Sequence, residues 1–304
     1  MPPSCAPGKL AAAIEDATER FTVYYGLWLG NAVRGELGFA REIAETFLRE
    51  AQREARATEC AAGRRLLGST CLWQGDFIEA QANLVEVLSY DPERDREARF
   101  RFLADTGATA RAILAITKWQ LGEVGPARVL IEEAVVDAIE IGHVPTLVAI
   151  YFYKAQFEMV RGDAGAARRD AEILVKLSQE NAMTQFTAWG ALRSAWASAR
   201  LDDRETGAMQ LRQALAAYTN QGNKLDVPFF QGFLAGPPVR HIRLFRATAQ
   251  HGPQHVGKLL GIVRHCSGEF ETHQELEHPL LFGKPDEESV QPEGGQKAGE
   301  LGRA

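Results

Sequence analysis

The chain has 304 residues, of which 45% are hydrophobic and 24% charged, and its formal net charge at pH 7 is −6. This length and composition allow a large buried core, while an acidic balance without a basic stripe argues against nucleic acid as a partner. No run of about 18 apolar residues occurs, and four scattered cysteines (Cys5, Cys60, Cys71 and Cys266) lack metal-type or redox-type spacing, so we expect reduced thiols in a cytoplasmic protein that does not span a membrane.

Residues 1–20 are interpreted as an N-terminal extension. Pro2, Pro3 and Pro7 open it, and the sequence becomes helix-prone from Leu10. The segment has no apolar stretch of signal-peptide quality before its first acidic residues. A repeating pattern then begins near Phe21.

Five copies of a two-helix pattern are predicted within residues 21–235. Each copy is centred on a tight turn, and successive turns are 40, 47, 40 and 40 residues apart. Glycine at such a turn can adopt the left-handed conformation that ends a helix, and an acid after it favours the start of the next helix. The five turns are Gly35-Glu36, Gly75-Asp76, Gly122-Glu123, Gly162-Asp163 and Asp202-Asp203.

Small residues recur at one fixed position of every copy. They stand five residues after the first turn residue, and apolar residues follow four and eight positions later on the same helix face. A small side chain there lets two antiparallel helices approach closely, while the larger apolar side chains fill the layer between copies. The small residues are Ala40, Ala80, Ala127, Ala167 and Gly207.

The copies continue in order along the chain. The first occupies about residues 21–51, the second ends at Asp91-Pro92, where proline cannot continue a helix, and seven additional residues precede the third. The remaining elements are 106–141 closed by Gly142, 145–180, 185–220 closed by Gly222, and a sixth first helix from Val227 to Leu234.

Fixed self-similarity of this kind is typical of helical solenoids, because one helix pair cannot bury both of its faces alone. We therefore expect an all-α fold: a right-handed superhelical solenoid of antiparallel helix pairs, with about five pairs and a partial sixth. The alternative is a generic helical bundle with accidental Gly–acid pairs. That alternative leaves the constant small residue after every turn unexplained.

Residues 236–304 depart from the pattern. Six of the seven histidines lie between His241 and His278, and no turn stands near residue 242, where the period would place one. This composition predicts a divergent, disordered tail, with at most a marginal helix over 255–263. A genuine tail and an out-of-frame translation are both compatible with it, and the gene sequence distinguishes them.

Two motifs in the tail partly resemble binding sites, one for phosphate and one for a metal ion. The stretch from Gly252 to Lys258 has the spacing of a phosphate-binding loop, but no apolar strand precedes it and Leu259 replaces the hydroxyl residue. His251 and His255 are separated by a Gly-Pro pair and match no zinc spacing. We therefore predict no catalytic residue, no cofactor-binding residue and no metal ligand.

The first helices of the pairs carry most of the large aromatic residues. In stacked repeats these helices commonly line the concave face, so the rings either form a peptide-binding groove or, as the simpler reading, pack between copies. The rings are Tyr24, Tyr25, Trp28, Trp119, Tyr151, Tyr153, Trp189 and Trp196. Polar residues one turn before the bend are the candidates for facing a groove: Asn31, Lys118, Glu158 and Ser198.

The repeats resemble tetratricopeptide repeats, although they are longer than the usual length. The resemblance rests on the downstream alanines above, on Asp91-Pro92, and on small residues seven positions before the turn: Gly68, Ala115, Ala155 and Ala195. A second resemblance, over about residues 20–235, is to the C-terminal repeat region of bacterial proteins that join a class III adenylate/guanylate cyclase to an ATPase module. It rests on YGLW (25–28), RGEL (34–37), LGSTCLWQGDFIEA (67–80), YDPERD (90–95), WQLGE (119–123) and QLRQALAAY (210–218).

That resemblance implies a regulatory region rather than an enzyme, since it matches none of the family's catalytic parts. We expect a non-catalytic scaffold that binds a protein or peptide, with a cyclase/ATPase protein among the candidate partners. The alternative is a detached subunit or truncated remnant of an adenylate cyclase.

Overall fold

The structure is a computed structural model that describes residues 14–91, 98–202 and 204–235. Within these ranges the chain forms α-helices and no strand, so the prediction of an all-α fold is confirmed. The helices are α2 (Ala17–Val33), α3 (Leu37–Arg53), α4 (Ala57–Gln74), α5 (Phe77–Val87), α6 (Thr106–Gln120), α7 (Val124–Ile141), α8 (Val144–Arg161), α9 (Ala164–Glu180), α10 (Thr184–Leu201), α11 (Arg204–Asn220) and α12 (Val227–Ala235).

Each predicted turn falls between two consecutive helices. Gly35, Gly75, Gly122 and Gly162 end α2, α4, α6 and α8 with φ of +75°, +82°, +88° and +84°. A side chain is disfavoured in this left-handed region, which is why glycine serves here. The fifth turn has no glycine, and Asp202 ends α10 in an extended conformation with φ of −99°.

The acid after the turn acts more directly than a helix-dipole effect when it is aspartate. Asp163 accepts a hydrogen bond from the amide of Ala166 at 2.9 Å, and Asp76 accepts one from the amide of Glu79 at 3.3 Å. Glu36 and Glu123 make no such bond at the same position. The shorter side chain therefore caps the second helix by hydrogen bonding, as aspartate commonly does.

Helix α2 begins four residues before the predicted start of the repeats at residue 21. Asp16 accepts a hydrogen bond from the amide of Glu19 at 2.8 Å and so caps a helix that starts at Ala17. The tail prediction for 236–304 and most of the extension lie outside the described residues.

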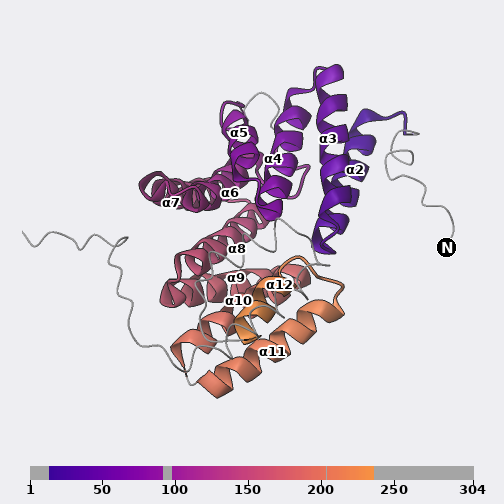
Figure 1. The fold of residues 1–304 in the computed structure, drawn as a ribbon. Coiled ribbons are helices and arrows are strands. Elements are labelled where there is room, and N and C mark those ends of the chain that lie inside the picture. Colours follow the sequence, from indigo (N-terminus) through magenta and orange to yellow (C-terminus); the bar gives the residue numbers. More distant parts are fainter. Residues whose placement is uncertain (1–13, 92–97, 203, 236–304) are drawn as a thin grey trace, which may run out of the picture. The chain divides into compact units, whose positions relative to one another are not determined.

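Helices pack on their neighbours in the chain, and the first helices of the pairs also pack on one another. Helices α2, α3 and α4 lie side by side (Figure 1), and α4, α6, α8 and α10 contact one another in succession. Ala40, Ala80, Ala127 and Ala167 are fully buried, and Gly207 is buried as well. The two helices of each pair thus pack against each other at the small residue, and apolar side chains from neighbouring pairs pack together between them.

The segment before α6 returns to this core. Phe102 is buried, and its ring centroid lies 5.5 Å from that of Phe47 and 5.6 Å from that of Tyr25. Asp105 then caps α6 by accepting a hydrogen bond from the amide of Ala108 at 2.7 Å. None of the helices in the described ranges is long and apolar enough to cross a bilayer.

Candidate binding cavity

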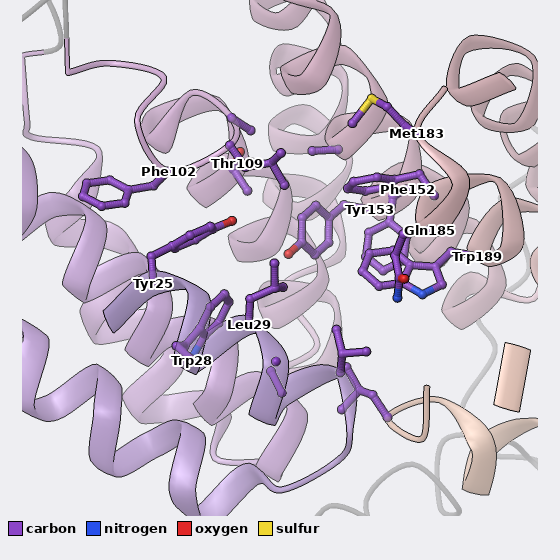
Figure 2. A pocket seen from close by; sticks show the side chains of 18 of the residues that line it. Tyr25, Trp28, Leu29, Phe102, Thr109, Phe152, Tyr153, Met183, Gln185 and Trp189 are labelled. Carbon is purple, nitrogen blue, oxygen red and sulfur yellow. The ribbon is translucent and has the colours of Figure 1, made fainter. Parts of the chain in front are cut away.

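A cavity of about 600 Å³ lies among the first helices of the pairs. Residues of α2, α4, α6, α8 and α10 line it, together with the segments 102–104 and 182–183, Tyr218, and residues 225–226. This volume is within the range of pockets that bind small molecules. Aromatic side chains dominate its wall, and Figure 2 labels six of them: Tyr25, Trp28, Phe102, Phe152, Tyr153 and Trp189. The others are Trp73, Phe186 and Tyr218.

Helical periodicity explains how these rings gather. Trp28 and Leu29 follow Tyr25 by three and four residues on α2, so both lie on the same side of that helix as Tyr25. Phe186 and Trp189 are three residues apart on α10 for the same reason. The ring nitrogen of Trp28 donates to Thr70 at 2.9 Å, and its ring stacks on Trp73 with centroids 5.7 Å apart.

The loop before α12 borders the cavity and contacts α2. The amides of Lys224 and Leu225 donate to the carbonyl of Val33 at 2.8 and 3.2 Å. Leu225 and Asp226 then line the cavity. Because these hydrogen bonds join backbone groups, they fix the loop against the end of α2 independently of side-chain identity.

Arg193 holds Asp226 at the edge of the cavity. The Arg193 side chain is fully buried, donates to Asp226 at 3.1 Å and to Gln156 at 2.7 Å, and lies 4.1 Å from the ring centroid of Phe152. A buried ion pair with further hydrogen bonds is satisfied electrostatically. Asp226 is therefore neutralised by a residue behind the cavity wall.

A second arginine, Arg65 on α4, lines the cavity directly and is 3% exposed. It donates to the carbonyl of Phe102 at 3.3 Å, and its guanidinium lies 5.8 Å from the ring centroid of Tyr25. The part of the chain that the structure describes gives Arg65 no ion-pair partner.

Tyr25 and Tyr153, two of the three tyrosines that line the cavity, are neutral at physiological pH. Burial raises the pKa of Tyr25, although Arg65 opposes this effect, and burial raises the pKa of Tyr153 to about 12. Their hydroxyl groups point toward one another (Figure 2). They can donate and accept hydrogen bonds but cannot supply negative charge.

The predicted aromatic residues divide between the two alternatives. Tyr25, Trp28, Tyr153 and Trp189 line the cavity, whereas the other four pack elsewhere: Tyr24, Trp119, Tyr151 and Trp196. Five further rings of the wall were not predicted from the sequence: Trp73, Phe102, Phe152, Phe186 and Tyr218. Phe152 and Phe186 could have been predicted from the faces of their helices. Phe102 could not, because it lies in the insertion before the third copy, where the repeat pattern does not define which residues face the core.

The four polar candidates do not line the cavity. The amide nitrogen of Asn31 donates to the Leu27 carbonyl at 2.7 Å, and Ser198 accepts from Arg168 at 3.1 Å. Lys118 pairs with Glu123, and Glu158, which is buried with a raised pKa, pairs with Arg161 and Lys154. A role for these residues in a groove stays a prediction. The motifs around Gly252–Lys258 and His251–His255, and the helix over 255–263, lie outside the described residues.

These features define an all-α protein with an aromatic cavity among the first helices of its pairs. No family model and no curated protein matches the chain. Among solved structures it is similar to the crystal structure of BtubC (BKLC) from P. vanneervenii, with a TM-score of 0.46 and 16% sequence identity over 82% of this chain and 99% of that one. At this TM-score the likeness carries no argument about fold or function.

Proposed function

We propose that this chain is a non-catalytic cytoplasmic scaffold that binds a protein or peptide through the cavity-bearing side of its first helices. The proposal includes a right-handed superhelical solenoid of tetratricopeptide type. The observation that carries it is the aromatic wall contributed by first helices of successive pairs. Large rings supply contact area at low conformational cost, and they are frequent at the energetic centres of interfaces.

The cavity chemistry suits binding better than catalysis. Its side chains offer aromatic faces, neutral hydroxyls and a guanidinium, and the tyrosine pKa values are too high for proton transfer near pH 7. A cavity that exists before the partner arrives reduces the entropy lost on binding. A segment of a partner with exposed apolar side chains is the occupant that this wall fits.

The resemblance to cyclase–ATPase proteins extends the proposal to a regulatory role. Tyr25, Trp28 and Trp73 belong to the segments that carry this resemblance, and all three line the cavity. A cyclase/ATPase protein is then a candidate partner. The other candidate, a detached subunit of an adenylate cyclase, predicts cyclic nucleotide formation by the purified chain together with its upstream modules and not by the chain alone.

A cavity-blocking variant tests the scaffold proposal. Gly26 lines the cavity at a solvent-exposed position, and a Cβ added there meets no atom within 4 Å, so Gly26→Trp should obstruct the open side of the cavity without disturbing the helix. Gly38 on α3 is equally open but lies outside the cavity, so Gly38→Trp is the matched control.

The full-length chain and both variants would serve as bait in extracts of the source cell. We expect partners that wild type and Gly38→Trp retain and Gly26→Trp loses. Equal retention by all three would contradict binding through the cavity. Cyclic nucleotide formation by the purified chain would contradict the non-catalytic role.

A further inference from the structure

Arg65 differs from the arginine beside it. Arg64 forms an ion pair with Glu86 at 2.6 Å and keeps 26% of its side chain exposed. Arg65 is 3% exposed, and within the described ranges no carboxylate pairs with it. A guanidinium does not lose its proton in proteins, so Arg65 keeps a full positive charge in the wall of the cavity.

The groups around Arg65 do not compensate for its burial. Its hydrogen bond to the Phe102 carbonyl is long at 3.3 Å, its other hydrogen-bonding neighbour is the uncharged Tyr25 hydroxyl, and its Nε atom is buried without a partner. The nearby hydroxyls of Tyr25 and Tyr153 are neutral. Removing a guanidinium from water costs more than one long hydrogen bond and neutral neighbours return.

Among the described residues, the lining of the cavity offers no unpaired negative charge. Its lining includes one carboxylate, Asp226, which is already paired with Arg193 at 3.1 Å and also accepts from Tyr218 at 3.5 Å. The ring nitrogen of Trp189 is a second buried donor without a partner. A ligand that completes this site must therefore bring hydrogen-bond acceptors and negative charge, together with an apolar body for the rings.

We propose that the cavity binds a small carboxylic acid with an aromatic or aliphatic body, whose carboxylate accepts hydrogen bonds from Arg65. The planar fork of a guanidinium matches a carboxylate in charge and geometry. A monoanion suits this site better than a phosphate dianion, because one guanidinium in an apolar wall neutralises one charge. The apolar C-terminal residue of a peptide presents the same chemistry, so the test includes both sources.

The acid would also regulate the proposed function, because it would compete with a partner segment for the same cavity wall. Only this regulatory part rests on the proposed function. The acid site itself depends only on Arg65 and the rings. Occupancy would release the partner, and the concentration of the acid would set the extent of release.

Calorimetric titration of the full-length chain tests the site. The probes are phenylbutyrate and its neutral analogue phenylbutyramide, and a short peptide ending in Leu-Phe as the free acid and as the amide. We expect phenylbutyrate to bind about 10- to 100-fold more tightly than the amide. Equal affinities, or no binding of any acid up to about 10 mM, would overturn the proposal.

The variants Arg65→Met and Arg64→Met form a matched pair. Arg65→Met should abolish the preference for acid over amide, while Arg64→Met should keep it. Since replacing an unpaired buried charge by an apolar side chain is neutral or stabilising, Arg65→Met should melt at the wild-type Tm or above. A lower Tm, or a retained acid preference, would assign Arg65 a structural role only. Should Arg65→Met fail to fold, Arg65→Lys keeps the charge without the fork and should show an intermediate preference.

The outcomes separate the two proposals. If phenylbutyrate binds, the peptide acid does not, and Gly26→Trp still captures the partner, the acid site is supported and the scaffold proposal is contradicted. If Gly26→Trp loses the partner and the acid and the amide bind equally, the scaffold proposal is supported and the acid site is contradicted. Tight binding of the peptide acid alone would assign Arg65 to the partner's C-terminus and overturn the small-acid ligand.

Discussion

Helices α10 and α11 approach each other closely at Gly207, the small residue of the fifth pair. A Cβ added to Gly207 would lie 2.9 Å from the amide nitrogen of Ala199 and 3.1 Å from the carbonyl oxygen of Ser198, and it would lie closer still to the Cα of Ala199. All of these atoms belong to the backbone, so no side-chain rotation can relieve the contact. The other four pairs have alanine at this position, fully buried.

The substitution Gly207→Ala therefore forces the two helices apart. Overpacking of this kind costs about 1–3 kcal/mol, while alanine gains about 1 kcal/mol over glycine in helix propensity. Because the contact is with backbone atoms, the overpacking cost lies at the upper end of its range, at about 3 kcal/mol. The net expectation is a loss of about 2 kcal/mol in the free energy of unfolding, which lowers the Tm by roughly 4–8 °C for a domain of this size.

Thermal unfolding followed by far-UV circular dichroism measures this difference. Gly26→Ala in the middle of α2 is the matched control, because a Cβ there meets no atom within 4 Å and alanine should raise stability by about 0.5–1 kcal/mol. A Gly207→Ala chain that melts at or above the wild-type Tm would show that the backbones do not constrain this position, and the reasoning from close approach would be refuted.

Three further predictions concern caps, tyrosines and a thiol. Asp163→Ala should lower the free energy of unfolding by about 1 kcal/mol in urea titrations, whereas Glu36→Ala, which removes no capping bond, should be near neutral. Tyr24 and Tyr153 have pKa values raised from 10.0 to about 12. Their contribution to the free energy of unfolding is therefore fully present below pH 10. It should be lost between about pH 10 and 12, because the unfolded chain releases these protons first. A urea midpoint that stays constant across that window would contradict the burial of the two hydroxyl groups. Cys71 is fully buried with its pKa raised to about 12, so peptide-resolved alkylation of the native chain should label Cys60 before Cys71.

Local features of the fold were readable from the sequence. The four turn glycines and the five small residues are short-range signals, because each reports a backbone conformation or a helix approach that its own neighbourhood requires. The bounds of the later helices followed from the same pattern. Helix α2 began earlier than expected, because its start depends on the cap at Asp16 rather than on the repeat.

The candidate site was only partly predictable, since the repeat pattern identifies a helix but not the surroundings of each face. Tyr24 and Tyr25 illustrate this limit. The Tyr24 hydroxyl donates to Glu50 at 2.9 Å, while Tyr25, about 100° further around the helix, lines the cavity. Arg65 and Asp226 acquire their different roles from contacts with distant segments, which no local spacing encodes.

The hydrogen bonds from Lys224 and Leu225 to Val33 bear on how the molecule comes apart. In repeat arrays with neighbour contacts alone, terminal units fray independently and cooperativity weakens with length. Here a residue near the beginning of the described chain shares its carbonyl with amides nearly two hundred positions later. Local opening of α2 should therefore expose those two amides to hydrogen exchange at the same rate, so that the first and last pairs belong to a single cooperative unit.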